Sequence, residues 1–440
     1  MVIPLALAAA MSIAAAARPV AWADLPPEVQ ARLQASGMQA AAFDAKVAAL
    51  DRDAARRVRE GDFDHLVFYV LQSTHFTTLP PIEPALSAKA LLAWEVRPKP
   101  ADTRTALAPP DVEARLHAFL DAVASGDRDP RLAYFRALLD GAQTREQRRV
   151  VIETEYQRAM VFLRRKEFEA RTPDAAARLY QTRGFSTDTA VEAGYAVQTG
   201  LGVLKALDPS RRIRRVLIVG PGMDLAPRTG MLEAGPPESY QPWAVIDALV
   251  ALGLANADDL VVVGADINPR VVDHLRASAA APPRLHLVSG IGASGAVTFA
   301  AGYREYFESL GRAVGTVHGD GGAPAGHLSK TVAVSARAAR TLRAERLNIV
   351  TERLTGEPFD LIVATNILPY FDHVERLLAL SNIAGMLAPG GVFLHNDPRP
   401  EVIQDATAAG LAGEQLRQVI VADVKGAPPL ADTIVLHRRR

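Results

Sequence analysis

The chain has 440 residues, of which 49% are hydrophobic, and its lysines and arginines balance its aspartates and glutamates at 49 each. This length and hydrophobic content are enough for more than one core, so we expect two domains. The balanced charge gives no indication of a nucleic-acid partner. The absence of cysteine excludes disulfides, thiol nucleophiles and thiolate metal sites.

The first residues resemble an export signal. The stretch "MVIPLALAAAMSIAAAA" is apolar and is followed by "AWA" at 21–23, a small-x-small cleavage pattern. It lacks the usual positive charges at its start, and it is too short and too rich in alanine to span a membrane well. We therefore predict a signal-peptide-like segment over 1–23 and an exported or periplasmic protein, with a cytoplasmic protein as the alternative.

Residues 24–208 are predicted to form a helical N-terminal domain. Apolar residues recur three and four positions apart over 112–124 and 147–171, with charges between them. Proline-rich breaks at 77–84 and 96–111 separate the helices. His65 and His75 are predicted to pack between helices.

Residues 209–440 change to short β-branched runs that alternate with helical patterns, which is typical of parallel βαβ units. The last two runs are joined by "KGAPPLA", which is too short for a crossover helix, so one of them should be antiparallel. The prediction is an α/β domain with a seven-stranded, mostly parallel sheet. Its strands are expected at 215–220, 260–266, 347–352, 359–365, 391–396, 417–424 and 432–437.

The first two predicted strands end in residues suited to a nucleotide. Gly220, Pro221, Gly222 and Asp224 follow the first strand directly, and glycines there let the backbone turn sharply and approach a ligand. Asp266 ends the second strand, where a carboxylate can accept hydrogen bonds from ribose hydroxyls. The simpler alternatives are a tight turn and an aspartate that caps the next helix.

Two kinds of nucleotide cofactor fit this pair of features. A dinucleotide dehydrogenase requires G-x-G-x-x-G to open a helix, whose N-terminus holds the pyrophosphate. Here the chain after Gly222 reads "MDLAPRTGMLEAGPPES", which is typical of a loop, and the next helix is expected near Gln241. S-adenosylmethionine has no phosphate and needs no such helix, so this cofactor is favoured.

The stretch "FDLIVATNILPYFD" at 359–372 begins as a buried strand and ends in Asn366, Pro369, Tyr370 and Asp372. Polar and aromatic residues that follow a parallel strand lie at the edge of the sheet where ligands bind in open α/β folds. Asn366 and Tyr370 are therefore candidate site residues. The alternative for Tyr370 is a place in the core.

In order along the chain, "LVVVGADINPRVVDHL", "GYREYFESLG", "FDLIVATNILPYFD" and "NIAGMLAPGGVFLHN" resemble the class I S-adenosylmethionine-dependent methyltransferases. The layout is most similar to the chemotaxis-receptor (CheR-type) branch, over 213–440 only. The resemblance implies a Rossmann-like methyltransferase sheet. It also implies that the cofactor contacts the residues Gly220, Pro221, Gly222, Asp224, Asp266, Ile267, Glu352 and Asn366.

The same resemblance implies that Asn366 and Tyr370 lie at the methyl-transfer end of the site. A second similarity, to the Asn-Pro-Pro-Tyr loop of enzymes that methylate amino groups, has one residue too many between Asn and Pro here. The chain departs from the family at Ile218, where many members carry an acid, and at 225–238, which we interpret as an insertion.

The function predicted from the sequence is methyl transfer from S-adenosylmethionine to an unidentified small molecule or protein side chain. The alternative is a non-catalytic binding or scaffold protein that retains the fold, and a dehydrogenase is the third hypothesis. No nucleic-acid partner and no metal are expected; His318, Asp320 and His327 are interpreted as part of a flexible insertion.

The segment that precedes the first strand is a candidate lid. Phe185, Ser186, Thr187 and Tyr195 would lie over the carboxyl edge of the sheet, with Gly184 as a hinge. An amphipathic helix packed on the sheet is the equally acceptable alternative.

Overall fold

The structure is a computed structural model that describes residues 16–95, 108–126, 129–226, 235–319, 322–323 and 325–440. Residues 1–15 of the predicted signal, most of the proline-rich break at 96–111, most of the insertion at 225–238, and Asp320 lie outside the described residues. Among the residues that are described, none of the helices is long and apolar enough to cross a membrane.

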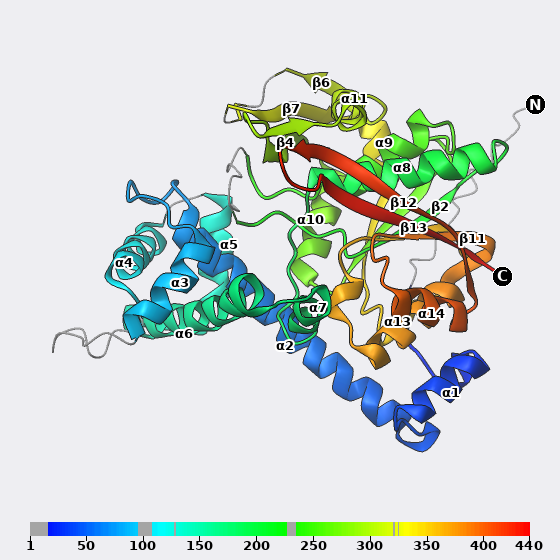
Figure 1. Cartoon of the computed structure of the whole chain (residues 1–440), viewed down its shortest axis with the longest axis horizontal. Coiled ribbons are helices and arrows are strands. Elements are labelled where there is room, and N and C mark those ends of the chain that lie inside the picture. The colour runs from blue at the N-terminus through cyan, green and yellow to red at the C-terminus, as the bar shows by residue number, and fades with distance from the viewer. Residues whose placement is uncertain (1–15, 96–107, 127–128, 227–234, 320–321, 324) are drawn as a thin grey trace, which may run out of the picture.

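The N-terminal region is largely helical, as predicted, and its helices α3 to α6 gather to one side of the sheet (Figure 1). Several of its helices begin with proline in the first turn, and side chains of Thr144, Asp129 and Thr172 cap three of them. Its helices are α1 (Pro27–Ala35), α2 (Phe43–Gln72), α3 (Pro84–Glu95), α4 (Pro110–Ser125), α5 (Pro130–Leu138), α6 (Arg145–Arg164), α7 (Pro173–Tyr180) and α8 (Val191–Leu207). Short turns of other helix types are η1 (Trp22–Asp24), η2 (Ala40–Ala42) and η4 (Arg165–Glu169).

The main sheet has eight strands in the order β5-β12-β13-β11-β10-β2-β3-β8. The five strands from β11 to β8 are parallel, and β13 is antiparallel to both of its neighbours, as expected for the last strand. The strands are β2 (Arg215–Val219), β3 (Val261–Asp266), β5 (Val297–Phe299), β8 (Leu342–Arg346), β10 (Phe359–Ala364), β11 (Leu387–His395), β12 (Leu411–Val424) and β13 (Leu430–Arg439).

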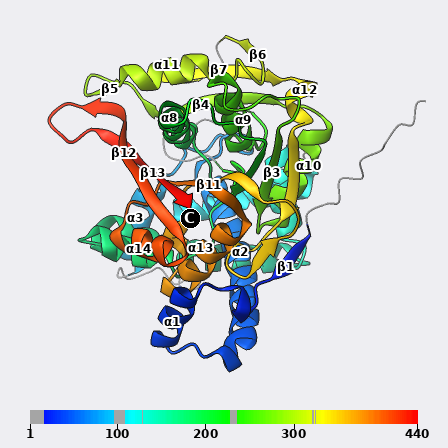
Figure 2. The same cartoon turned by 90° about the vertical axis from the view of Figure 1, so that its right-hand side faces the viewer.

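Helices cover both faces of this sheet (Figure 2). Val216 and Ile218 of β2 pack into the hydrophobic cluster shared with α8, α9 and α10, whereas Leu217 and Val219 face the cluster shared with α1, α13 and α14. The alternation follows from the two-residue period of a strand, and burial on both faces explains the continuous apolar run. The covering helices after β2 are α9 (Gln241–Ala251), α10 (Pro269–Ala280), α13 (His373–Met386) and α14 (Pro400–Ala408).

The prediction of the third strand at 347–352 is wrong. The strand next to β3 is β8, at Leu342–Arg346. Leu347, Ile349 and Val350 are apolar because they are buried in the core after the strand has ended. The chain then forms β9 (Glu352–Leu354), which pairs with β1 (Ala17–Pro19) in a separate two-stranded sheet.

A second correction concerns the segment around His318 and His327. Its flanks are paired strands rather than a flexible insertion: β6 (Gly315–His318) and β4 (Arg284–Gly292) both pair with β7 (His327–Val334) in an antiparallel sheet. The helix α11 (Ala301–Ser309) lies between β4 and β6 in the sequence, and α12 (Ala336–Ala339) follows β7. The short β5 joins the edge of the main sheet, which therefore has eight strands rather than the predicted seven.

The helical region and the sheet share a hydrophobic core. A single cluster of buried residues contains Phe63 and Phe119 from α2 and α4, Leu201 from α8, and Val216 from β2. At the start of the described chain, β1 pairs with β9, and the ring of Trp22 packs against that of Phe43 with their centroids 5.4 Å apart. Residues 16–23 of the predicted signal segment are thus folded against the rest of the protein.

Candidate active site

A cavity lies at the carboxyl ends of β2, β3, β8 and β10 and is covered by Val58 of α2 and by residues 185–188. It encloses about 760 Å³ of empty space when its open mouth is included. Because β3 and β10 lie on opposite sides of β2, the strand order reverses here, and this is the position where open α/β sheets bind ligands.

Six of the residues predicted from the sequence line this cavity. They are Gly220, Gly222, Asp266, Ile267, Asn366 and Tyr370. Three others do not contribute to its lining: Pro221, Asp224 and Glu352. The main chain of Asp224 instead forms a bridge with Glu238, across the segment predicted as an insertion.

The glycine loop has the backbone geometry that only glycine adopts readily. Gly220 and Gly222 have φ angles of 67° and 69°, in the left-handed region. A Cβ atom on Gly222 would lie 2.2 Å from the carbonyl oxygen of Thr187, and one on Gly220 would lie 2.7 Å from Ile367 Cγ2. In the described part of 223–240 the chain is not helical, so the loop does not open a helix.

Asp266 has a buried carboxylate with two backbone partners. Asn268 N donates to its Oδ1 at 2.8 Å, and Gly222 N donates to its Oδ2 at 3.4 Å. Burial, with a smaller contribution from the nearby Asp62, raises the pKa of Asp266 to about 6, although the backbone donors act in the opposite direction. The cap of α10 is Asn268, whose side chain accepts from Arg270 N, so Asp266 is not the helix cap.

The loop after β8 brings Leu347, Asn348 and Ile349 to the cavity. Glu352 lies behind this loop, where its Oε2 accepts a hydrogen bond from Asn348 N at 2.8 Å. Reasoning from the sequence missed Asn348 because it placed the third strand five residues too late. A prediction that ended this strand at Arg346 would have placed Asn348 in the loop at the edge of the sheet.

The turn after β10 holds Asn366 in a strained conformation. Its φ of 60° is the only positive value among the described residues other than glycine. Two hydrogen bonds with Asn396 hold Asn366 in place, and each residue donates one of them. Asn366 N donates to Asn396 Oδ1 at 2.8 Å, and Asn396 Nδ2 donates to Asn366 Oδ1 at 2.7 Å. Backbone strain of this kind is retained where the surrounding structure enforces it, often at functional sites.

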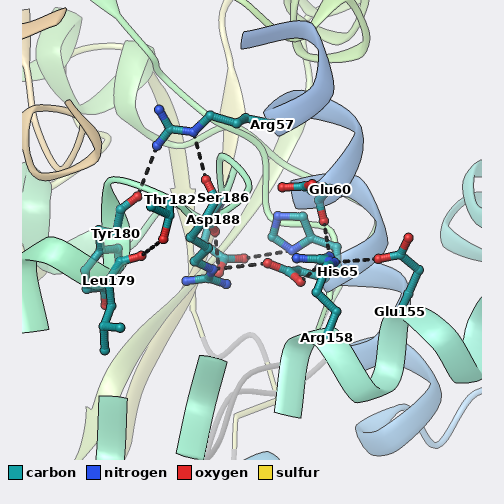
Figure 3. A network of polar contacts seen from close by, with 12 residues as sticks. Arg57, Glu60, His65, Glu155, Arg158, Leu179, Tyr180, Thr182, Ser186 and Asp188 are labelled. Atoms are coloured by element: carbon teal, nitrogen blue, oxygen red, sulfur yellow. Dashed lines mark hydrogen bonds and ion pairs between the residues drawn. The ribbon is translucent and has the colours of Figure 1, made fainter. Parts of the chain in front are cut away.

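Tyr370 is largely buried, and its ring packs edge-on against Tyr180 and Phe185 at 5.5 and 5.7 Å. Its carbonyl accepts a hydrogen bond from the buried Arg57, which also donates to the carbonyl of Tyr180 (Figure 3). Tyr370 therefore lines the cavity and also belongs to the hydrophobic core.

The candidate lid divides into two parts. Phe185, Ser186 and Thr187 line the cavity, whereas Tyr195 lies on α8 and packs against Tyr303 and Tyr306. A Cβ atom on Gly184 would lie 2.4 Å from Gly61 N, so this glycine allows the close approach of α2. This close approach explains why residue 184 is a glycine, and no hinge is needed to explain it.

Asp188 also lines the cavity, and its neighbour His65 was predicted only to pack between helices. Among the described residues of the lining, the charged side chains are the carboxylates of Asp188 and Asp266, and there is no lysine, arginine or histidine. Such a cavity favours a cationic ligand and disfavours a phosphate.

The strand order, the antiparallel end of the sheet and the cavity at the reversal point define an open, Rossmann-like α/β fold. No protein-family model matches the sequence, and no curated protein is significantly similar to it. Solved structures of S-adenosylmethionine-dependent methyltransferases are similar to the chain over roughly half of its length.

One of these is a TehB-like S-adenosylmethionine-dependent methyltransferase from Corynebacterium glutamicum, with 13% identity over 56% of this chain and 87% of that one, and a TM-score of 0.28. The N-methyltransferase NodS from Bradyrhizobium japonicum, in complex with S-adenosyl-L-homocysteine, has 15% identity, the same two coverages and a TM-score of 0.30. Magnesium protoporphyrin IX methyltransferase from Synechocystis, with bound cofactor, has 9% identity over 64% and 90%, and a TM-score of 0.29. Similarities at this level assign neither an activity nor an acceptor to this chain.

Proposed function

We propose that this protein binds S-adenosylmethionine in the cavity at the end of β2 and transfers its methyl group to an acceptor. The observation that carries this proposal is the charge of the lining: two carboxylates and no basic side chain among the described residues. S-adenosylmethionine is cationic at its sulfonium and at its α-ammonium group. A nicotinamide dinucleotide carries a pyrophosphate. The glycine loop after β2 does not open a helix that would hold this group, and the described lining has no basic side chain to bind it.

The residues present fit the cofactor. The buried carboxylate of Asp266 would accept from the ribose hydroxyls, and Ile267, Asn348 and Ile349 would enclose the adenine. The left-handed glycine loop allows a ligand to approach the backbone of Gly220 without a Cβ atom in the way. The order of β2, β3 and β8 along the edge of the sheet supports these positions.

When bound, the cofactor supplies a methyl group that is already activated as a sulfonium. The protein then has to orient the acceptor and exclude water, and orientation alone can provide much of the rate enhancement. Tyr370 and Phe185 form an aromatic wall of the cavity, and Asn366 is held rigidly by Asn396. We assign these three residues to the methyl-transfer end of the site. The similarity to the CheR-type branch stays a prediction, and the acceptor is either a small molecule or a protein side chain.

Binding is tested by isothermal titration of the purified protein with S-adenosylmethionine, S-adenosylhomocysteine and, as a contrast, a nicotinamide dinucleotide. We expect heat of binding with the first two only. The absence of binding at millimolar S-adenosylmethionine would refute the proposal, and selective binding of the dinucleotide would favour the dehydrogenase instead.

Catalysis is tested separately, since a scaffold protein could retain the cofactor site. The protein is incubated with methyl-labelled cofactor and a cell lysate, with the Asp266→Asn variant as the matched control. Transfer of label by the parent protein and weaker transfer by the variant would support the enzyme. Cofactor binding without any transfer of label would favour the non-catalytic alternative.

A further inference from the structure

The segment that covers the cavity is attached directly to the glycine loop. Met223 N donates to the carbonyl of Thr187 at 2.7 Å, and Thr187 Oγ1 donates to the carbonyl of Met223 at 2.9 Å. Gly222 lies so close to Thr187 that a Cβ atom would clash with it, and the carbonyl oxygen of Asp188 is 3.7 Å from the same position. Asp188 is therefore held beside the glycine loop, at the β2 end of the cavity.

Two neighbours orient the carboxylate of Asp188. Ser186 Oγ donates to its Oδ2 at 2.9 Å, and His65 Nδ1 lies 3.4 Å from its Oδ1 (Figure 3). Thr187 N donates to His65 Nε2 at 3.0 Å, so this nitrogen is the acceptor and the ring proton is on Nδ1, facing Asp188. The arrangement fixes the orientation of the Asp188 carboxylate at the wall of the cavity.

The two acidic side chains of the lining lie at different strand ends. Asp266 ends β3, where the ribose of the proposed cofactor would lie, and Asp188 lies over the loop that follows β2. The residues that end β2 itself are apolar, including Ile218 and Val219. The carboxylate beside the glycine loop thus comes from a segment that precedes the sheet in the sequence.

We propose that Asp188 binds the α-ammonium group of the amino-acid arm of the cofactor. This assignment rests on the proposed function, because it requires S-adenosylmethionine or its product in the cavity. A carboxylate has about four acceptor positions, so Asp188 can accept from an ammonium group while it keeps Ser186 and His65 as neighbours. The side chain of Asp188 is only 14% exposed, and hydrogen bonds between charged groups are stronger than those between neutral groups.

The test uses two probes that differ in the amino-acid arm. S-adenosylhomocysteine carries the α-ammonium group, whereas 5′-methylthioadenosine has the same adenosine and thioether but no amino-acid arm. For Asp188→Asn we expect the affinity for S-adenosylhomocysteine to fall about 10- to 100-fold, the range for the loss of a charged hydrogen bond. The affinity for 5′-methylthioadenosine should change less than about twofold, which is close to neutral on the same scale.

Two further variants keep the result interpretable. Asp273→Asn removes an exposed carboxylate from α10 and should leave both affinities unchanged. Ser186→Ala removes one donor to Asp188 but keeps its charge, and it should weaken S-adenosylhomocysteine less than Asp188→Asn does. Melting curves of all variants confirm that they are folded.

Each other outcome has a distinct meaning. An unchanged affinity of Asp188→Asn for S-adenosylhomocysteine, or an equal loss with both probes, would overturn the assignment of Asp188 while the cofactor site stands. If neither probe binds the parent protein, the proposed function and this assignment both fail.

Discussion

Thr187 and Met223 are joined by two hydrogen bonds that run in opposite directions, from Met223 N to Thr187 O at 2.7 Å and from Thr187 Oγ1 to Met223 O at 2.9 Å. The first residue belongs to the segment that closes the cavity and the second to the glycine loop at its floor. The segment that closes the cavity and the glycine loop are therefore coupled. A substitution in one of them should alter the structure of the other.

Gly222→Ala tests this coupling. The new Cβ atom would lie 2.2 Å from Thr187 O, and alanine would have to adopt a φ of 69°. The left-handed conformation alone costs an L-residue roughly 1 to 2 kcal/mol. We expect a lower melting temperature and weaker cofactor binding. Gly202→Ala, on α8 with open space around the new atom, is the control and should not destabilise the protein. Equal melting temperatures for the two variants would contradict the close contact.

Asp266→Asn should weaken the binding of S-adenosylmethionine by about 1 to 3 kcal/mol, because a charged hydrogen-bond acceptor is lost. The variant should remain folded, since burial disfavours the ionised form of this side chain and its loss removes that cost. Titration calorimetry measures the affinity and a melting curve checks the fold. A variant that binds as tightly as the parent would show that Asp266 does not contact the ribose.

Cofactor affinity should depend on pH through Asp266. Its pKa is raised to about 6, so the carboxylate is ionised at pH 7.5 and mostly protonated at pH 5. Only the ionised form accepts hydrogen bonds from both ribose hydroxyls, so affinity should fall as the pH is lowered through 6. In Asp266→Asn this part of the pH dependence should disappear. A parent protein whose affinity is constant from pH 7.5 to 5 would contradict the assignment.

The same raised pKa predicts that Asp266 affects the stability of the fold in the opposite direction from cofactor affinity as the pH is lowered. Between the unfolded pKa, about 3.9, and the folded value, the native state binds more protons than the unfolded state. The contribution of Asp266 to the free energy of unfolding therefore increases as the pH falls through 6. The difference in the free energy of unfolding between the parent and Asp266→Asn should therefore be smaller at pH 5 than at pH 7.5. Denaturation of both proteins at the two pH values measures this difference.

The N-terminal segment allows a separate prediction. A protein that starts at Asp24, as after cleavage of the predicted signal, loses the pairing of β1 with β9 and the ion pair of Arg18 with Asp24. Compared with a protein that starts at Ala16, it should melt at a lower temperature. N-terminal sequencing of the protein from its native cells tests export directly. A mature chain that starts at Asp24 and is equally stable would show that β1 is dispensable.

The sequence by itself determined the parts of the fold that depend on local pattern. The runs at 215–220, 260–266 and 359–365 became β2, β3 and β10, because strands buried on both faces require continuous β-branched residues. The antiparallel final strand followed from a connection too short for a helix. Local pattern failed at 347–352, where an apolar run serves the core and not a strand, and the prediction therefore selected Glu352 in place of Asn348.

Only the tertiary structure decided which residues from outside the sheet complete the site. His65 and Asp188 are 123 positions apart and lie 3.4 Å from each other, and Arg57 reaches the carbonyl of Tyr370 across 313 positions. No periodicity or motif spacing carries such information, because these contacts form when α2 packs against the segment before β2 and against the turn after β10. The charge of the cavity has the same origin, since it depends on which side chains converge there and not on the neutral composition of the chain.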